Sequence, residues 1–133
     1  MQPSILIVDD QPQISKILSD LLSKKGYTVN LAFNGEMGYQ KAMETNPSLI
    51  IMDIMMPILS GFDSVKKIRN HPELHNVPVI FLTAKGQDSD RLEAEKLGAV
   101  GFITKPFSPK NILQIIEGIL EKKEDRLNPK NLE

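Results

Sequence analysis

Five short apolar runs, each followed by a helix-like stretch, restrict this chain to very few architectures. The runs occupy 5–8, 28–32, 49–52, 79–82 and 100–103. Four of them are continuously or almost continuously apolar, which is typical of strands buried on both faces. The run 28–32 alternates between apolar and polar residues and therefore predicts an edge strand with one solvated side.

The stretches between the runs carry the pattern and the end signals of amphipathic helices. Ile14, Ile17, Leu18, Leu21 and Leu22 form one apolar stripe at helical spacing. Gly26 is expected to end this helix, Asn34 to cap the second, and Ser60 with Asp63 to form a capping box at the start of the third. A weaker helix is expected at about 88–97. Ser108-Pro109 is expected to begin the last helix, whose apolar stripe lies at 112, 113, 115, 116, 119 and 120.

This order of strand and helix, repeated five times, predicts an α/β domain with a parallel sheet covered on both faces. Right-handed crossovers allow a closed barrel or an open doubly wound sheet. Five units are too few for an eight-stranded barrel, so the open sheet is the prediction. Its ligand site is expected beyond the carboxyl ends of the strands.

Composition excludes several classes of function. The 133 residues correspond to one domain, and the absence of cysteine excludes disulfides, thiolate nucleophiles and cysteine zinc sites. A net charge of −1 provides no basic surface for direct nucleic-acid binding. The sequence shows neither a membrane-length apolar run nor a signal peptide, and a cytoplasmic location is expected.

Residues with functional side chains follow four of the five apolar runs. Asp9 and Asp10 follow the first, Asp53 the third, Thr83 the fourth and Lys105 the fifth. In a parallel sheet these residues meet at one edge, where we expect limited solvent exposure. Clustered carboxylates repel one another, so the cluster must hold a proton or bind a cation. An all-oxygen ligand set with room for water favours Mg²⁺.

Each of these residues also has an ordinary structural interpretation. Asp10 could cap the helix that contains Ile14, Thr83 could simply end a strand, and Lys105 could be a solvated lysine. Asp53 lies several residues before the next expected cap, Ser60, and has no such alternative. The convergence of all these residues on one edge favours a functional site.

Four motifs in this order resemble the receiver domains of two-component response regulators. They are 5–10 (ILIVDD), 52–57 (MDIMMP) with Gly61, 82–84 (LTA) and 102–107 (FITKPF). The resemblance covers about residues 4–121. It implies a flavodoxin-like (βα)5 fold with strand order 2-1-3-4-5. The domain would then span 1–121, and the charged segment 122–133 would be a tail or the start of a linker.

The resemblance also implies a reaction and a role for each site residue. Asp53 would accept a phosphoryl group from the phosphohistidine of a sensor histidine kinase or a phosphotransfer protein. Asp10, Asp53 and the backbone carbonyl of Met55 would ligate Mg²⁺, with Asp9 acting mainly through water. Thr83 and Lys105 would bind phosphoryl oxygens. Beyond its own phosphoryl transfer and dephosphorylation, the domain would not be an enzyme.

A conformational switch is implied as well. Thr83 would move toward the phosphoryl group and Phe102 would rotate into the space that it leaves. The changed face would consist of the fourth helix, the fifth strand and the fifth helix, and it would contact an output domain or a second copy. The Lys105–Pro106 peptide bond would be cis. Phe102 also has a plain interpretation as a core residue.

The sequence departs from the family pattern at a few positions. Val100 and Gly101 stand where many receivers have two acids, and Phe102 replaces the commoner tyrosine. Met55 and Lys85 occupy positions that tune dephosphorylation in the family, so we expect both to affect the lifetime of the phosphoryl group.

Three other classes of protein fit the sequence less well. A phosphatase of the haloacid dehalogenase type needs a second acid two residues after its nucleophile, where this chain has Met55. A flavodoxin-type cofactor carrier needs a phosphate-binding loop after the first strand, where Asp9 and Asp10 would repel phosphate. A receiver-like docking module without phosphorylation would lack Asp10, Asp53 or Lys105, and all three are present.

Overall fold

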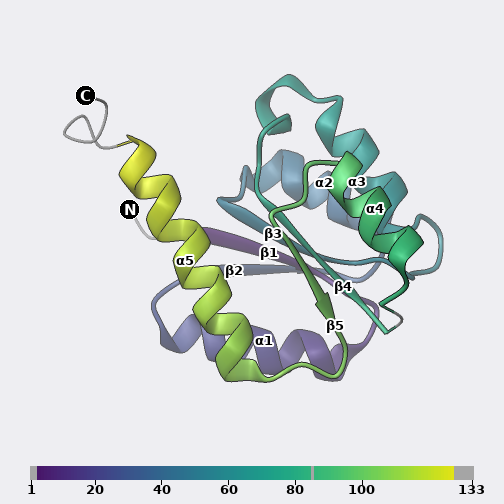
Figure 1. The fold of residues 1–133 in the computed structure, drawn as a ribbon. Helices are drawn as coiled ribbons and strands as arrows, with labels where there is room; N and C mark the ends of the chain where they lie inside the picture. The colour runs from purple at the N-terminus through teal and green to yellow at the C-terminus, as the bar shows by residue number, and fades with distance from the viewer. Residues whose placement is uncertain (1–2, 85, 128–133) are drawn as a thin grey trace.

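A computed structural model describes residues 3–84 and 86–127 and shows five parallel strands in the order β2-β1-β3-β4-β5 (Figure 1). The strands are β1 (Ser4–Val8), β2 (Thr28–Ala32), β3 (Leu49–Asp53), β4 (Val79–Thr83) and β5 (Gly101–Thr104). The predicted fold class and strand order are confirmed. The fifth strand begins at Gly101 rather than at Val100, whose side chain is half exposed.

Helices cover both faces of the sheet, with α1 and α5 on one side and α2, α3 and α4 on the other (Figure 1). Their bounds are α1 (Pro12–Lys24), α2 (Gly35–Thr45), α3 (Gly61–Arg69), the 3₁₀ turn η1 (Pro72–Leu74), α4 (Asp88–Lys96) and α5 (Pro109–Leu127). Helix α5 therefore continues past 121, where the charged segment was expected to begin. The rest of that segment, 128–133, lies outside the described residues. Among the helices described, none combines the length and apolar character needed to cross a bilayer.

Alternate residues of each central strand supply two separate cores, which explains why these strands are apolar throughout. In β1, Leu6 and Val8 pack under α2 and α3, whereas Ile5 and Ile7 pack under α1 and α5. The edge strand β2 is only half-buried, as its alternation predicted. Two residues of the expected helix stripes, Ile17 and Ile115, are exposed instead of buried.

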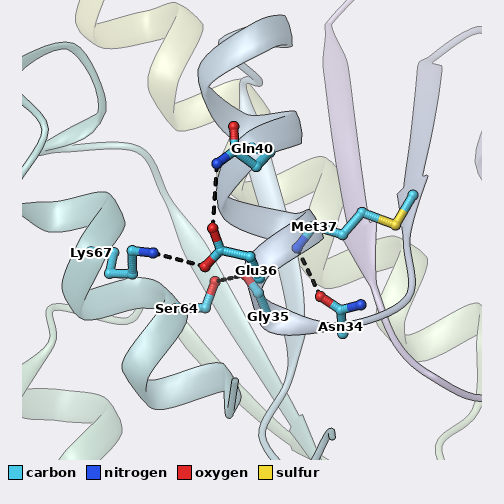
Figure 2. A network of polar contacts seen from close by, with 7 residues as sticks. All are labelled: Asn34, Gly35, Glu36, Met37, Gln40, Ser64 and Lys67. Atoms are coloured by element: carbon cyan, nitrogen blue, oxygen red, sulfur yellow. Dashed lines mark hydrogen bonds and ion pairs between the residues drawn. The ribbon is translucent and has the colours of Figure 1, made fainter. Parts of the chain in front are cut away.

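The helix caps explain where α2 and α3 begin. Asn34 Oδ1 accepts a hydrogen bond from the backbone N–H of Met37 (2.8 Å), and Ser60 Oγ accepts one from that of Asp63 (3.2 Å). Figure 2 shows the first of these contacts. The interpretation of Asp10 as the cap of α1 is wrong. The cap position belongs to Gln11, which makes no side-chain capping bond.

Helix α4 is attached mainly through its carboxyl end. Ala94 is its buried residue, and Leu92 is exposed. Arg69 of α3 donates from Nε to the Leu97 carbonyl (2.9 Å) and from Nη1 to the Val77 carbonyl (2.6 Å). The amino end of α4 adjoins the carboxyl edge of the sheet, where Gln87 and Asp90 line a groove together with Asp10.

Candidate functional site

The carboxyl edge of the sheet brings together the acids, the threonine and the lysine that the sequence predicted. Asp9 directly follows β1, Asp53 ends β3, Thr83 ends β4 and Lys105 directly follows β5. Asp9, Asp53 and Thr83 are buried, with exposed fractions of 0%, 4% and 1%.

Asp10 differs from the expectation of limited exposure, because its side chain is exposed. The backbone N–H of Asp9 still donates to the Ala32 carbonyl (3.1 Å), which extends the pairing of β1 with β2 by one residue. Successive side chains of an extended strand point to opposite sides, so Asp9 lies inside and Asp10 lies at the rim.

The three carboxyl groups form one cluster, and the Lys105 ammonium group pairs with two of them. One oxygen each from Asp9, Asp10 and Asp53 lies within 4.8 Å of the others. Lys105 Nζ lies 2.9 Å from Asp9 Oδ2 and 3.4 Å from Asp53 Oδ2. The lysine therefore offsets the repulsion between two buried carboxylates but carries only one positive charge for three acids.

Burial together with this shortage of positive charge perturbs the pKa of Asp53. Burial, followed by the charge of Asp9, raises the pKa of Asp53 from 3.8 to about 7, against the opposing effect of Lys105. Asp10 adds a smaller upward contribution to this pKa. A second cation beside the cluster would favour the ionised form of Asp53.

The oxygen atoms of the cluster fit a hard divalent cation. Asp9 Oδ1 accepts a hydrogen bond from the backbone N–H of Gln11 (2.8 Å). Asp9 Oδ2 is buried and accepts no hydrogen bond, even though the Lys105 ammonium lies close to it as an ion pair. The ion pair with Lys105 compensates part of the charge on this oxygen, and a metal ion or its bound water would supply a further partner. The chemistry of this donor set favours Mg²⁺.

Gln11 belongs to the site, although the sequence analysis assigned it no role there. Its Oε1 accepts a hydrogen bond from Lys105 Nζ (2.8 Å), and its backbone N–H contacts Asp9. The only signal in the sequence is its position directly after Asp9 and Asp10. Glutamine at the start of a helix is otherwise unremarkable.

An open groove of about 710 Å³ adjoins the cluster, between the β3–α3 loop and the start of α4. Asp10 and Met55 line it together, and Gln87 and Asp90 form its far wall. The side chain of Met55 is exposed. Lys85, the other residue expected to affect phosphoryl lifetime, lies outside the described residues.

Backbone contacts connect the ends of β4 and β5 below the cluster. The backbone N–H of Lys105 donates to the Thr83 carbonyl (2.7 Å), and the Lys105–Pro106 bond is cis, as the resemblance implied. Phe102 is half-buried, packs against the core beneath α4, and has the Arg91 guanidinium 4.7 Å from its ring centroid. Thr83 and Phe102, the two residues of the expected switch, thus lie on two neighbouring, hydrogen-bonded strands.

Comparison with known sequences identifies relatives over almost the whole chain. Residues 5–117 match the family model of the response regulator receiver domain. The chain is 36% identical over 132 residues to the probable transcriptional regulator ycf29 of Porphyra purpurea, covering 99% of this chain and 62% of that protein. It is 36% identical over 122 residues to the transcriptional regulatory protein SrrA of Staphylococcus aureus, covering 92% of this chain and 49% of that protein. The chain thus spans about half to three-fifths of these relatives.

Solved structures show the same fold. The chemotaxis protein CheY4 of Vibrio cholerae superposes with a TM-score of 0.85 at 30% identity, covering 90% of this chain and 99% of that one. A CheY-like receiver domain protein from Methanospirillum hungatei gives a TM-score of 0.87 at 26% identity, covering 95% of this chain and 99% of that one. From the match over residues 5–117, the sheet order and these superpositions, the chain belongs to the response regulator receiver domain family.

Proposed function

We propose that this receiver domain accepts a phosphoryl group on Asp53 from the phosphohistidine of a sensor histidine kinase or a phosphotransfer protein. The observation that carries the proposal is the placement of the Lys105 ammonium group, 2.9 Å from Asp9 and 3.4 Å from Asp53, beside two members of a cluster of three acids. A nucleophilic carboxylate, a lysine and a cation site are the components that phosphoryl transfer needs.

In the proposed reaction, an ionised oxygen of Asp53 attacks the phosphorus atom. The bond between phosphorus and the histidine nitrogen breaks, and its electron pair remains on the departing imidazole. The product on this chain is an aspartyl phosphate. Lys105 exchanges its contacts with the carboxylates for a phosphoryl oxygen, and the Thr83 hydroxyl donates a hydrogen bond to another.

The proposed reaction includes a Mg²⁺ ion bound beside Asp53. Asp10, Asp53 and the backbone carbonyl of Met55 would hold the ion, and Asp9 would act mainly through water. When bound, it would neutralise charge on the phosphoryl oxygens and lower the pKa of Asp53. The buried Asp9 oxygen that accepts no hydrogen bond and the shared groove of Asp10 and Met55 support this assignment.

We further propose that phosphorylation acts through Thr83 and Phe102 on the face formed by α4, β5 and α5. Three exposed apolar residues lie on these elements or directly before β5, namely Leu92, Val100 and Ile115. An output domain or a second copy of the chain would cover them. Relatives named as transcriptional regulators are longer than this chain and are consistent with an output domain. The cytoplasm is the proposed location.

Intact-mass analysis tests the proposed reaction directly. The 133-residue chain is incubated with acetyl phosphate and Mg²⁺, or with acetyl phosphate and EDTA. We expect one phosphoryl adduct that requires Mg²⁺ and is absent from Asp53→Asn. Asp20→Asn is the matched control, because Asp20 is an exposed acid on α1, and it should be phosphorylated like the wild type. An adduct on Asp53→Asn, or none on the wild type with any donor, would refute the proposal.

A further inference from the structure

The loop between β3 and α3 is strained at Ile58. Ile58 has a φ angle of +73°, and the backbone N–H of Leu59 donates to the Pro57 carbonyl (2.8 Å) across it. This combination is that of a γ-turn with positive φ, which is rare and strained. A β-branched residue is especially unfavourable there. Ile58 is also 80% exposed, so little packing of its side chain offsets the strain.

Two backbone hydrogen bonds hold this loop in place. The N–H of Gly61 donates to the Ile54 carbonyl (2.8 Å), and the N–H of Gly35 donates to the Leu59 carbonyl (3.1 Å). Gly35 comes from the start of α2, far from the loop in sequence. A Cβ atom at Gly35 would overlap the Leu59 carbonyl oxygen, so glycine is required for this close approach.

A side-chain hydrogen bond from Ser64 fixes the Gly35 backbone, whose N–H donates to the Leu59 carbonyl. Ser64 Oγ donates to the Gly35 carbonyl (2.7 Å), and the side chain is completely buried between α2 and α3. Figure 2 shows Ser64 pointing from α3 to the Gly35 backbone. The contacts therefore form one connected path from Ser64 through the Gly35 backbone to Leu59 and the strained turn.

We propose that Ser64 and Gly35 are positioning residues for the cation site, because they hold the strained loop in the conformation that places Met55 beside Asp10. This inference rests on the proposed function. Met55 belongs to the same loop and lines the groove together with Asp10. Backbone strain persists only where surrounding contacts enforce it. When the Gly35–Leu59 contact is weakened, Ile58 relaxes, the Met55 backbone moves away from Asp10, and Mg²⁺ binds less tightly.

The same pair of helices offers a matched control. Lys67 of α3 donates to Glu36 of α2 through an exposed Nζ–Oε2 contact of 2.7 Å (Figure 2). This hydrogen bond lowers the pKa of Glu36. Lys67→Ala therefore removes a contact between α2 and α3 without touching the path to Leu59. A general loosening of the two helices and a specific effect on the loop can thus be separated.

The test is a Mg²⁺ titration of the 133-residue chain followed by amide shifts in ¹H–¹⁵N NMR spectra. The wild type is titrated first, and the absence of binding there would refute the Mg²⁺ site of the proposed function itself. We expect Ser64→Ala to weaken Mg²⁺ binding about three- to tenfold, below the range for residues that contact metal ligands directly. Lys67→Ala should remain within about twofold of the wild type. Adding Ile58→Gly to Ser64→Ala should restore most of the affinity, because glycine adopts positive φ without strain.

The outcomes that overturn the inference are equally specific. Ser64→Ala with lower stability but wild-type Mg²⁺ affinity would make Ser64 a structural residue only. An equal loss of affinity in Lys67→Ala, or a lack of recovery with Ile58→Gly, would exclude the loop as the cause. If Ser64→Ala does not fold, Gly35→Ala displaces the same loop from its other side, and its wild-type Mg²⁺ affinity would also overturn the inference. Gly35 has no positive φ, so alanine there acts through the contact with Leu59 alone.

Discussion

Replacing Asp53 by asparagine should stabilise the metal-free protein at pH 8. Burial and the neighbouring charge of Asp9 raise the pKa of Asp53 from 3.8 to about 7. At pH 8 the carboxyl group must therefore be ionised in an environment that disfavours its charge. Asparagine has nearly the same shape and removes this charge. Lys105 retains an ion pair with Asp9 at 2.9 Å and a hydrogen bond to Gln11 at 2.8 Å.

The magnitude follows from the pKa shift. The difference between about 7 and 3.8 is about 3 pH units, and one unit corresponds to about 1.4 kcal/mol, which gives an upper bound of about 4 kcal/mol. The cluster opens to solvent at the rim, where Asp10 is exposed, so screening by water reduces this bound by roughly half. The buried amide also needs new hydrogen-bond partners. We expect a net gain of about 1–2 kcal/mol in the free energy of unfolding.

The pH dependence has a defined sign. Between pH 3.8 and about 7 the folded wild type binds more protons at Asp53 than the unfolded chain does. The contribution of Asp53 to stability therefore falls as pH rises through this window and is lowest above pH 7. The advantage of Asp53→Asn should be full at pH 8 and about half as large near pH 5.5.

Urea unfolding in the presence of EDTA measures this difference. For a domain of this size, 1–2 kcal/mol corresponds to a midpoint roughly 0.5–1 M higher in urea at pH 8, with an unchanged slope. Asp20→Asn is the control and should shift stability by less than about 0.5 kcal/mol. Excess Mg²⁺ should stabilise the wild type more than Asp53→Asn and narrow the gap. A variant that is equally or less stable than the wild type at pH 8 in EDTA would refute the reasoning.

Three further predictions concern other parts of the domain. Ile58→Gly should raise the free energy of unfolding by about 1 kcal/mol, because glycine adopts the left-handed backbone conformation of position 58 without strain. Urea unfolding measures this change, and a decrease in the free energy of unfolding would contradict the prediction. Arg69→Ala should lower it by about 2–3 kcal/mol, because the Leu97 and Val77 carbonyls lose their donors, and hydrogen exchange at the end of α4 should become faster. Met55→Asn combined with Lys85→Glu should change the rate at which the phosphoryl adduct decays in time-resolved mass spectra. An unchanged decay rate would show that neither position tunes the lifetime.

The sheet and the convergence of its edge residues could be predicted because both follow from local pattern and chain topology. Continuous apolar runs indicate strands buried on two faces, and right-handed crossovers make them parallel. Any residue that follows a strand then lies at the same edge. The order of the strands alone therefore brings Asp9, Asp53, Thr83 and Lys105 to one edge.

Details of the site that depend on side-chain direction could not be predicted in the same way. Asp10 was expected to be shielded and lies exposed at the rim, one residue beyond its buried neighbour Asp9. Gln11 contacts Lys105, 94 positions away in sequence, and nothing in the local sequence marks that contact. Such contacts depend on side-chain rotamers and on the spacing between strands, and only the packed structure determines these.

The sequence by itself therefore determined the α/β class, the buried strands and the set of residues at the carboxyl edge, because hydrophobic periodicity acts over a few residues and is written in the chain. The tertiary structure alone decided how the β3–α3 loop is held. Ser64 and Gly35 are 29 positions apart, and no sequence motif marks the contact between the Ser64 hydroxyl and the Gly35 backbone carbonyl. Their hydrogen bond forms because α2 and α3 pack side by side on the sheet, and in the proposal above this packing holds Ile58 in a backbone conformation that its own sequence disfavours.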